Sequence, residues 1–592
     1  LHYPLRRQRQ MCIRDSYKTH TFAFMKKFSS KRSIQVLAHI LKEYGILNVV
    51  ISPGSRNAPL AIHFGEMDEI STYSIVDERS AAFVALGMAQ STKMPVAVTC
   101  TSGSASANYY PAVTEAFYQN VPLLVLTADR PTDYVDIFDG QTIRQKDLYQ
   151  LHSYGDFQLM EDDKDGSEDY NFETVKKAVE LCLEKQGPVH INIPLSEPLY
   201  DLVTELPTFP SIEKTIQKRP YDLPSNLVAD WNSSKRILIL VGTRAYSEEL
   251  QAQLSQLVKN HSVVVLCEAN SNLHHEKFFR HIDRYIYNFS DEDFKIYAPD
   301  LLITVGQNVV SKKVKQFLRK SQPKNHWHID EFWQPDTYFC LTQKVETKAE
   351  VFFGKLLNHI KLEPQPYYNL WDVLRDKKDA KHKEYVNRTG FSDFNLFWLI
   401  SQKVPAKFNI HFSNSSAIRY AQLFDFNQNR IYCNRGTSGI DGSTSTAMGF
   451  AIKNENPTLL VTGDLSFFYD INGLWNQYIP PYTRIIIFNN GEGNIFKIIP
   501  GPDKANSNIL DEFIATTHQK NAEHLAKHFG FEYIKVEDDN TVERVLDNFF
   551  NPDVQPKILE VCTQAVENAE VLRSYFDFLS GKDVKTPWDA DN

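Results

Sequence analysis

Two polar side chains in the carboxyl-terminal third of the chain have the types and the placement that suit a divalent cation. Asp464 follows an apolar segment expected as a strand at residues 458–461, and Asn490 follows a second one at residues 484–488. Parallel strands end at the same edge of a sheet, so Asp464 and Asn490 are expected to lie close together. Carboxylate and amide oxygens at such an edge suit Mg²⁺ or Ca²⁺ holding a diphosphate. Taken alone, these residues are equally compatible with two ordinary turns rich in Gly and Asn.

The stretch from Gly463 to Asn490 resembles the metal–diphosphate motif of thiamine-diphosphate enzymes. The resemblance implies a Mg²⁺ or Mn²⁺ ion bound by Asp464, Asn490 and the backbone carbonyl of Glu492. It also implies that Ile440 is an apolar buttress that bends the cofactor, where the alternative is an ordinary core isoleucine. The cofactor-binding residues implied in this half of the chain are Ser438, Gly439, Ile440, Gly463, Asp464, Leu465, Ser466 and Asn490.

Glu78 is the candidate for the other half of a cofactor site. It follows a strand expected at residues 72–76 and opens an Ala-rich helical segment. An acidic residue at a helix start commonly complements the helix dipole, by about 0.3–1 kcal/mol. In thiamine-diphosphate enzymes a glutamate so placed binds N1′ of the aminopyrimidine, and the resemblance gives Glu78 that role. Such a glutamate must be protonated, which burial favours. The resemblance further implies that the two half-sites pair across a dimer interface.

Several other segments resemble one family of these enzymes. They are ISPGSRNAPL (51–60), TADRP (127–131) with GQTIRQ (140–145), SNSSAIR (413–419) and NRGTSGIDGSTSTAMG (434–449). The family is that of 2-succinyl-5-enolpyruvyl-6-hydroxy-3-cyclohexene-1-carboxylate (SEPHCHC) synthase of menaquinone biosynthesis, and the resemblance runs from about Lys27 to Thr563. The GDLS form at residues 463–466, in place of the more common GDG, is a further mark of the family.

Four arginines, at positions 56, 130, 419 and 435, are expected at strand ends or turns inside these segments. The family condenses 2-oxoglutarate with isochorismate, and both substrates are dianions. Because the chain carries a net charge of −9, it must concentrate cations locally to bind them. Planar guanidinium groups suit carboxylates well. A surface salt bridge is the more frequent fate of a single arginine, but four inside family-matched segments favour a substrate site.

The resemblance assigns a role to each candidate. Ser55 and Arg56 would contact the isochorismate-derived acceptor, Gln141 would lie near the reacting centre, and Ile495 and Phe496 would form an apolar wall. The catalytic residues are Glu78, Gln141 and Ser415. The substrate-binding residues are Ser55, Arg56, Arg130, Lys312, Lys313, Ser415, Arg419, Arg435, Ile495 and Phe496. No histidine is assigned a catalytic role.

Two positions depart from the family pattern. Lys312-Lys313 follows Ser311 where the family often has Lys-Arg, so a bidentate contact from Lys313 is in doubt. Glu492 occupies a position where a small residue is usual. Its side chain is expected to face solvent, because otherwise it would oppose the diphosphate.

The activity implied is thiamine-diphosphate-dependent decarboxylation of 2-oxoglutarate. The resulting succinic-semialdehyde enamine would add in a 1,4 fashion to isochorismate, giving SEPHCHC and CO₂. The alternative is another thiamine-diphosphate 2-oxoacid decarboxylase or carboligase, such as acetohydroxyacid synthase. A catalytically inactive homologue is disfavoured because Glu78, Asp464 and Asn490 are all present. The resemblance implies a homodimer or homotetramer.

Length and composition set limits on the class of protein. At 592 residues, with 42% hydrophobic and 23% charged residues, the chain is expected to form several globular domains. No apolar run approaches the roughly 20 residues that span a bilayer. The pI near 6.1 argues against a nucleic-acid-binding protein. Seven widely separated cysteines exclude a CxxC motif and suit a reducing compartment, so a cytoplasmic location is expected.

Three blocks of alternating strands and helices must position these residues, and they predict an α/β fold of three open parallel-sheet domains. The strands are expected at residues 48–52, 72–76, 96–99, 123–127 and 189–193; at 236–241, 263–267, 301–305 and 326–329; and at 409–413, 430–434, 458–461, 484–488 and 557–561. The expected domains are pyrimidine-binding (25–205), central spacer (206–385) and diphosphate-binding (386–592). The first and third resemble a duplicated fold without a sequence repeat.

Two connecting regions complete the expected organisation. Residues 1–24 are Arg-rich and differ in composition from the rest of the chain, so a non-native or disordered leader is expected there, with an organellar transit peptide as the alternative. An amphipathic helix is expected to begin at Met25. Prolines accumulate over residues 194–224, which predicts a linker.

Overall fold

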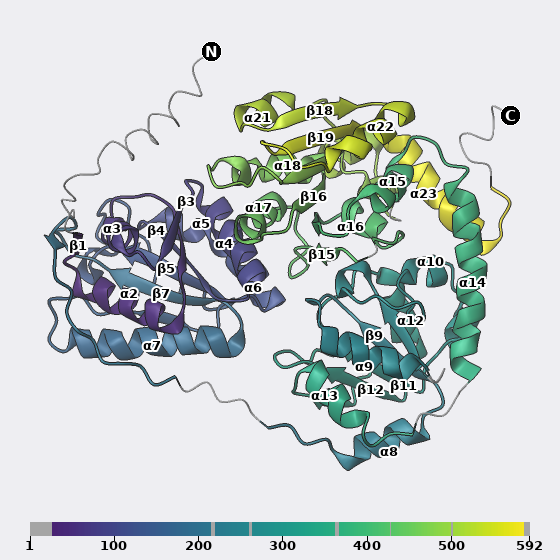
Figure 1. Ribbon diagram of the computed structural model, residues 1–592, viewed down its shortest axis with the longest axis horizontal. Helices are drawn as coiled ribbons and strands as arrows, with labels where there is room; N and C mark the ends of the chain where they lie inside the picture. Colours follow the sequence, from purple (N-terminus) through teal and green to yellow (C-terminus); the bar gives the residue numbers. More distant parts are fainter. Residues whose placement is uncertain are drawn as a thin grey trace.

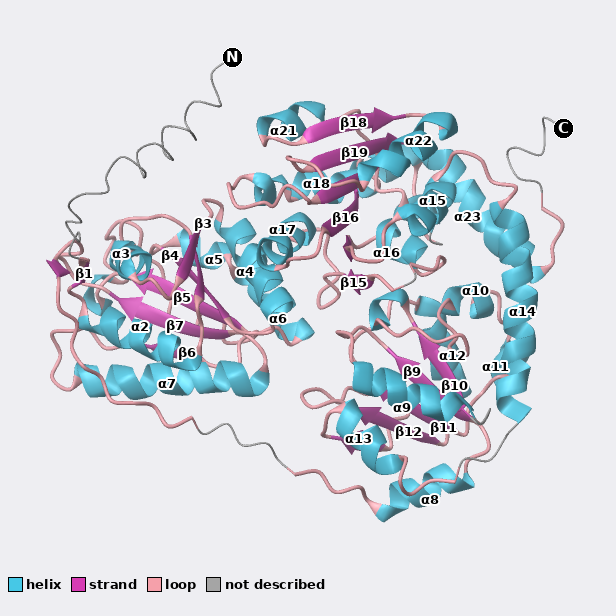
Figure 2. Ribbon diagram, viewed as in Figure 1, coloured by secondary structure: helices cyan, strands magenta, loops and turns pink. Residues whose placement is uncertain are grey.

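The computed structural model describes residues 26–214, 220–259, 263–361, 366–426, 428–498 and 501–584 (Figure 1). The expected leader at residues 1–24 lies outside them. Three separate parallel sheets, each with helices packed against it, make up the molecule (Figure 2). This confirms the predicted α/β class. Within the described residues, no helix has the length and apolar character needed to cross a membrane.

The first sheet has the order β3-β2-β4-β5-β7-β6 and is parallel throughout. Its strands are β2 (Asn48–Ile51), β3 (Ser71–Ser74), β4 (Val96–Cys100), β5 (Leu123–Asp129), β6 (Asp156–Gln158) and β7 (Val189–Pro194). Its helices are α2 (Arg32–Tyr44), α3 (Ala58–Glu66), α4 (Glu78–Thr92), α5 (Ser104–Asn108), α6 (Tyr110–Gln119) and α7 (Ser167–Lys185). The central strands β4, β5 and β7 are buried along their whole length, as expected for a sheet covered on both faces.

Two expectations for this region were wrong in detail. The helix expected from Met25 begins only at Arg32, because β1 (Phe28–Ser29) precedes it. β1 pairs antiparallel with β8 (Leu202–Val203), which lies inside the Pro-rich segment expected as a linker. Part of that segment is therefore bound to the first domain.

The second sheet has the order β10-β9-β11-β12-β13 and is also parallel. Its strands are β9 (Ile237–Val241), β10 (Val263–Cys267), β11 (Leu301–Val305), β12 (Asn325–Ile329) and β13 (Gln343–Val345). Its helices are α8 (Ser225–Ser233), α9 (Glu248–Lys259), α10 (Ile282–Ile286), α11 (Asp291–Ile296), α12 (Lys312–Ser321) and α13 (Ala349–Leu356). The long helix α14 (Pro366–Val386) leads from this domain along its side toward the third (Figure 1).

The third sheet has the order β15-β14-β16-β17-β19-β18, again parallel. Its strands are β14 (Asn409–Phe412), β15 (Arg430–Tyr432), β16 (Thr458–Gly463), β17 (Arg484–Asn489), β18 (Glu532–Val536) and β19 (Lys557–Cys562). Its helices are α15 (Asp393–Lys403), α16 (Ser416–Ala421), α17 (Ser443–Lys453), α18 (Asp464–Tyr469), α19 (Ile495–Ile498), α20 (Ser507–Ile509), α21 (Glu523–His528), α22 (Asp539–Phe549) and α23 (Ala565–Ser580).

The first and third sheets share one topology. Numbered along the chain within each sheet, both have the strand order 2-1-3-4-6-5. Helices α4 and α17 each follow the second strand of their sheet, and they pack against each other (Figure 1). A Cβ on Gly87 would lie 2.0 Å from the Thr446 carbonyl oxygen, and one on Gly449 would lie 2.0 Å from the Val84 carbonyl oxygen. The two contacts are reciprocal, which agrees with a duplicated fold.

Within the three parallel sheets, three strands were not anticipated, and all lie at a sheet edge. They are β6, β13 and β18. Edge strands are covered on fewer sides, and these three have mostly half-buried or exposed residues, so they lack the apolar runs of the central strands. The sheets fall within the ranges 25–205, 206–385 and 386–592; the boundaries themselves stay predictions.

Candidate cofactor and substrate sites

Asp464 and Asn490 lie at the same edge of the third sheet, as expected. β16 and β17 are adjacent and parallel, and Gly463 pairs with Phe488, so the residues that follow the two strands are neighbours. Asp464 is buried; its Oδ2 accepts from the Gly491 N–H at 2.9 Å. The Asn490 Oδ1 is buried and has no hydrogen-bond partner among the described residues. Oxygen atoms of these types, one of them unpartnered, fit a Mg²⁺ or Mn²⁺ site.

Two residues near this pair were not found from the sequence. The buried Asp393 accepts a hydrogen bond from Asn490 Nδ2 at 3.3 Å, and burial raises the pKa of Asp393 to about 6, with the nearby Asp464 charge adding to the effect. His518 Nε2 lies 3.4 Å from Asp464 Oδ2. Both residues are remote in sequence from the motif, so only the fold reveals their proximity. Ser392 caps α15, of which Asp393 is the first residue, and such a cap does not by itself indicate a functional site.

The expectation that the Glu492 side chain faces solvent is wrong. Glu492 is buried, and its Oε2 lies 2.7 Å from Lys497 Nζ on α19. The ammonium group neutralises the carboxylate, which explains how an acidic residue is accommodated in this loop. The Glu492 backbone carbonyl, expected as the third metal ligand, accepts from the Asn494 N–H at 2.9 Å.

The loop around Ile440 is held by hydrogen bonds to its backbone. The Ile440 carbonyl accepts from Ser466 Oγ at 2.7 Å, and the Gly439 carbonyl accepts from Asn414 Nδ2 at 2.7 Å. Ser438 has a positive φ of 65°. The Ile440 side chain is 39% exposed, so it is not an ordinary core isoleucine. An exposed apolar side chain beside the metal motif fits the predicted contact with a cofactor.

Asn414 belongs to the SNSSAIR segment but was not predicted as a site residue. Besides Gly439, its Nδ2 donates to the Asn434 carbonyl at 2.6 Å, and its Oδ1 accepts from Arg435 Nη1 at 3.0 Å. Asn414 therefore joins the turn after β14 to the loop after β15. Ser415, which follows it, immediately precedes α16 and has a φ of 69°, and its side chain makes no capping hydrogen bond to that helix.

Glu78 is the first residue of α4, as predicted. Its neighbours bind the third domain: Asp77 Oδ2 accepts from Asn472 Nδ2 at 2.7 Å, and Arg79 Nη2 donates to the Tyr469 carbonyl at 2.7 Å. The Glu78 carboxyl has no hydrogen bond or ion pair with the described residues and is half-buried. It remains available to a ligand.

One group of basic residues lies where the second and third domains meet. Arg419 belongs to it: burial lowers its pKa, the nearby Asp283 opposes that shift, and Arg435 adds to it. Lys313 Nζ lies 4.4 Å from the centre of the Tyr287 ring, and burial lowers the pKa of Lys315. Cations held close together in this way favour an anionic ligand. Lys312 also starts α12, but its side chain is exposed.

The cations of the first domain form a second group, near the ends of β2 and β5. Arg56 is buried; its Nη1 donates to the Leu195 carbonyl at 2.8 Å, and its Nη2 lies 3.2 Å from Glu197 Oε1. Burial lowers the pKa of Arg56, and the charge of Arg130 lowers it further. Ser55 is exposed beside Arg56.

Gln141 lies in the loop after this group and has a φ of 56°. A Cβ on Gly103 would lie 3.3 Å from the Gln141 carbonyl oxygen, so the absence of a side chain at Gly103 lets the loop approach closely. Gln145, also in the GQTIRQ segment, is buried and accepts from the Gly103 N–H at 2.8 Å, which fixes the loop to the end of β4.

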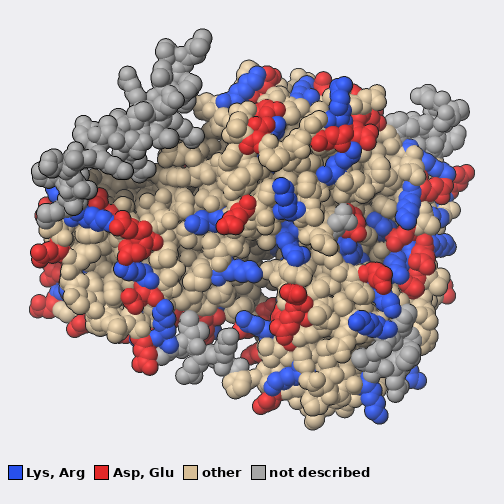
Figure 3. Space-filling view, in the orientation of Figure 1, with Lys and Arg blue, Asp and Glu red and all other residues tan. Residues whose placement is uncertain are grey.

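The two groups of cations share no hydrogen bond or ion pair among the described residues. Among the described residues, the hydrogen bonds and ion pairs of Arg56 and Arg130 involve only the first domain, and those of Arg419 and Arg435 involve only the second and third. On the face shown in Figure 3, basic and acidic side chains are interspersed, so the net negative charge is not gathered there in one patch. Each group is thus a local concentration of positive charge.

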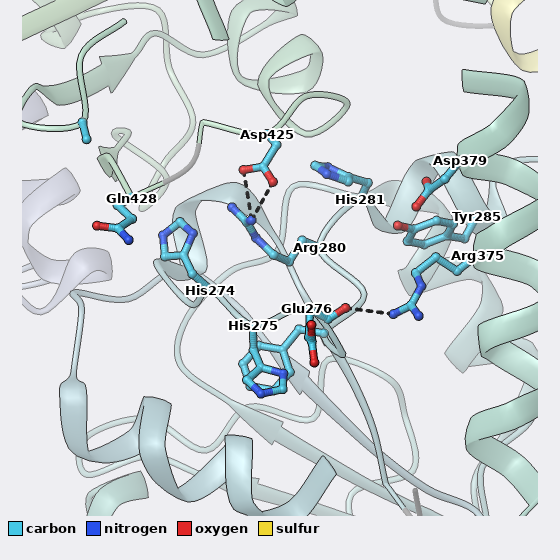
Figure 4. A pocket seen from close by; sticks show the side chains of 12 residues that line it. His274, His275, Glu276, Arg280, His281, Tyr285, Arg375, Asp379, Asp425 and Gln428 are labelled. Atoms are coloured by element: carbon cyan, nitrogen blue, oxygen red, sulfur yellow. Dashed lines mark hydrogen bonds and ion pairs between the residues drawn. The ribbon is translucent and has the colours of Figure 1, made fainter. Parts of the chain in front are cut away.

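A pocket of about 860 Å³ lies between the second and third domains (Figure 4). Within it, Arg280 Nη1 lies 3.0 Å from Asp425 Oδ1, and Arg375 Nη1 donates to the Glu276 backbone carbonyl at 3.0 Å. Arg375 and Asp379 form ion pairs with Asp372 and Arg284, respectively, which do not line the pocket. None of the predicted site residues lines it among those described. No ligand is assigned to this pocket.

Comparison with known proteins agrees with this arrangement. Residues 32–154 match a family model described as the thiamine pyrophosphate enzyme N-terminal TPP binding domain. Residues 415–561 match the thiamine pyrophosphate enzyme C-terminal TPP binding domain. The first range contains Glu78, and the second contains Asp464 and Asn490. The fold and the two half-sites therefore define a thiamine-diphosphate enzyme.

Relatives similar over nearly the whole chain specify the family within that class. The chain is 44% identical to 2-succinyl-5-enolpyruvyl-6-hydroxy-3-cyclohexene-1-carboxylate synthase of Flavobacterium johnsoniae, over 92% of this chain and 98% of that protein. It is 43% identical to the protein of the same name from Christiangramia forsetii (90% and 96%) and 36% identical to that from Porphyromonas gingivalis (94% and 98%). The chain belongs to the family of SEPHCHC synthases.

Proposed function

We propose that this protein decarboxylates 2-oxoglutarate and joins the remaining four-carbon unit to isochorismate by 1,4-addition, giving SEPHCHC and CO₂ in menaquinone biosynthesis. The observation that carries the proposal is similarity along more than nine-tenths of the chain to proteins named for this product. The two groups of cations support it, because both substrates are dianions and need paired guanidinium or ammonium groups.

The cofactor would lie between Glu78 and the edge of the third sheet. Bound thiamine diphosphate supplies the nucleophilic carbon and the electron sink that a decarboxylation needs. Glu78 would donate a hydrogen bond to the aminopyrimidine, and Ile440 would pack against the cofactor. Asp464 and Asn490, with the Glu492 backbone carbonyl, would hold Mg²⁺ or Mn²⁺ on the diphosphate, a role supported by the unpartnered Asn490 Oδ1.

The substrates would be bound from both sides of the cofactor. Arg56 and Arg130 would bind one set of carboxylates, with Ser55 and Gln141 beside them. The Arg419 and Arg435 guanidinium groups would bind another set on the opposite side. The remaining residues proposed for that side are Ser415, Lys312, Lys313, Ile495 and Phe496. Closely spaced cations whose pKa values are lowered by burial gain most from an anionic partner.

We further propose a homodimer or homotetramer in which each site draws on two subunits. The lack of any hydrogen bond or ion pair between the two groups of cations, among the described residues of one chain, is compatible with this arrangement. Exposed apolar side chains also lie near the cofactor motifs, at Val76, Tyr469 and Trp475, where a second subunit would cover them. The described cysteines are free thiols, which supports a cytoplasmic location.

The direct test is product analysis with both substrates. The full-length protein, given thiamine diphosphate and Mg²⁺, is expected to release CO₂ from 2-oxoglutarate and to form SEPHCHC only when isochorismate is present. Carboligation of pyruvate independent of isochorismate would overturn the proposal and indicate a different thiamine-diphosphate carboligase, such as acetohydroxyacid synthase.

A further inference from the structure

Asn490 has a neighbour that determines which way its side-chain amide faces. Asn490 Nδ2 donates to Asp393 Oδ2 at 3.3 Å, whereas Asn490 Oδ1 is buried and unpartnered among the described residues. An ionised carboxylate only accepts hydrogen bonds, so the amide must turn its NH₂ group toward Asp393. The oxygen is thereby directed away from Asp393 and left free to accept a ligand.

Asp393 is itself fixed by a closed ring of hydrogen bonds. Its backbone N–H donates to Asn568 Oδ1 at 2.8 Å, Asn568 Nδ2 donates to Thr563 Oγ1 at 2.9 Å, and that hydroxyl donates to Asp393 Oδ1 at 2.6 Å. All three residues are buried. Asp393 is also the first residue of α15, where the helix dipole favours a negative charge. The carboxylate therefore has one well-defined orientation.

The sheet brings the members of this network together. β17 pairs with β19, with Asn489 opposite Cys562, so Asn490 and Thr563 each follow a strand at the same edge. The Thr563 N–H donates to the Asn489 carbonyl at 3.1 Å, which extends the pairing by one residue. The position of Asn490 is thus tied to α15 and α23 through groups that do not belong to the metal motif.

We propose that Asp393 is a positioning residue for the divalent cation: it holds the Asn490 amide so that its oxygen, and not its NH₂ group, faces the metal. This inference rests on the proposed function, which makes Asn490 a metal ligand. Asp393 acts through Asn490 and is not itself a ligand. Residues that orient metal ligands in this way affect metal affinity by about 10- to 100-fold.

The test is the substitution Asp393→Asn, followed by calorimetric titration of the full-length protein with Mg²⁺ in the presence of thiamine diphosphate. The substituted amide has one acceptor oxygen, so it cannot accept from both Thr563 and Asn490. The oxygen should stay with Thr563, whose hydroxyl already accepts from Asn568 Nδ2 and needs an acceptor for its own proton. The NH₂ group then faces Asn490, which must turn over and present its own NH₂ to the metal. We expect Mg²⁺ affinity to fall about 10- to 100-fold.

A second substitution distinguishes positioning from a purely structural role. In the double variant Asp393→Asn with Asn490→Asp, residue 490 carries two acceptor oxygens, so one can accept from the amide while the other faces the metal. Most of the lost Mg²⁺ affinity is therefore expected to return. Thr563→Val is the matched control, because it breaks the same ring without removing the acceptor for Asn490. It is expected to lower thermal stability while costing less Mg²⁺ affinity than Asp393→Asn.

Each outcome decides the matter. Unchanged Mg²⁺ affinity in Asp393→Asn would overturn the inference, and so would a loss that the double variant does not restore. Failure of the unmodified protein to bind Mg²⁺ with thiamine diphosphate would instead refute the proposed metal site, and this result is seen before any variant is made. Circular dichroism melting of each variant without metal identifies those that fail to fold.

Discussion

At the scale of single residues, the side chains proposed to contact cofactor and substrates are held by others that do not. Asn414 joins two substrate-site turns through three hydrogen bonds to Asn434, Gly439 and Arg435. The Lys497 ammonium group neutralises the Glu492 carboxylate in the loop that follows β17. Because Asn414 and Lys497 already hold these loops before any ligand binds, the ligand-binding groups need little rearrangement.

Arg419 should matter for substrate binding far more than an exposed arginine does. Arg419→Ala removes a guanidinium group next to Arg435 and is expected to lower kcat/KM for product formation about 10- to 100-fold, since hydrogen bonds to charged groups contribute about 1.5–3 kcal/mol. The control is Arg388→Ala, which removes an exposed arginine paired with Glu384 on α14. Steady-state kinetics with both substrates measure the effect; equal losses in the two variants would contradict the assignment.

Local sequence was sufficient to place Asp464 and Asn490, because each directly follows an apolar strand whose direction fixes where the next residue lies. It also placed Glu78, which opens the helix after β3. The roles of the three residues stay predictions. Asp393 and His518 could not be predicted, since their proximity to the motif depends on how distant elements pack. The Glu492 side chain was predicted wrongly because its partner, Lys497, becomes a neighbour only once α19 forms.

At the scale of elements, the contact between α4 and α17 organises the junction of the first and third domains. Both helices follow equivalent strands, and each contributes one glycine to the crossing. The start of α17 is fixed by Asp470, which accepts from the Ser445 N–H at 2.7 Å and from Ser445 Oγ at 2.8 Å. The sequence pattern predicted the helix opened by Glu78 but could not reveal that it touches α17.

Gly87→Ala is expected to destabilise this crossing. The added methyl group would lie 2.0 Å from a backbone oxygen that cannot move independently, and overpacking of this kind costs about 1–3 kcal/mol. Gly65→Ala in α3 is the matched control: its methyl group would meet nothing within 4 Å, so it should stabilise the helix by about 0.5–1 kcal/mol. Thermal melting of the two variants should shift in opposite directions, and a parallel shift would contradict the role given to Gly87.

Asp470 should make stability depend on pH. Burial raises the pKa of Asp470 to about 7, compared with about 3.9 for an unfolded aspartate. Between these values the folded protein retains a proton that the unfolded chain has lost, so the free energy of unfolding falls as pH rises through this window. Asp470→Asn should reduce that slope by up to about 1.4 kcal/mol per pH unit.

Urea unfolding of the unmodified protein and of Asp470→Asn, at about pH 5 and about pH 8, measures this difference. Burial also raises the pKa of Glu268 to about 7. Because Glu268 is unaltered in the variant, part of the pH dependence of stability is expected to remain. An identical slope in both proteins would show that Asp470 is ionised throughout the range.

At the scale of the whole molecule, each chain carries both predicted half-sites, and its two groups of cations share no hydrogen bond or ion pair among the described residues. The sequence predicted three α/β domains and the two half-sites, because each is a local pattern of strands and turns. The placement of one half-site relative to the other could not be read from such patterns. Assembly of subunits is the proposed means by which Glu78 of one chain meets Asp464 of another.

Mixing two inactive variants tests this arrangement. Glu78→Gln alone should lower activity about 10²- to 10⁴-fold, as expected for loss of a group that moves a proton. Asp464→Ala should prevent metal binding. If sites are shared, mixed dimers contain one intact site, and random reassembly should restore about one quarter of the normal activity. No recovery after subunit exchange, verified by mass spectrometry of differently tagged chains, would contradict shared sites.

The crossing of α4 and α17 also fixes how far Glu78 lies from the point where the two helices meet. Glu78 begins α4, and Gly87 lies further along the same helix, roughly 13 Å away at 1.5 Å per residue. Because Gly87 lies against the backbone of α17, the crossing point on α4 is fixed at a residue that has no side chain. If α4 slid by one turn, a larger residue would reach the crossing point and push α4 and α17 apart. The position of the Glu78 carboxyl, proposed as catalytic, is therefore set by a glycine about two and a half turns further along the same helix.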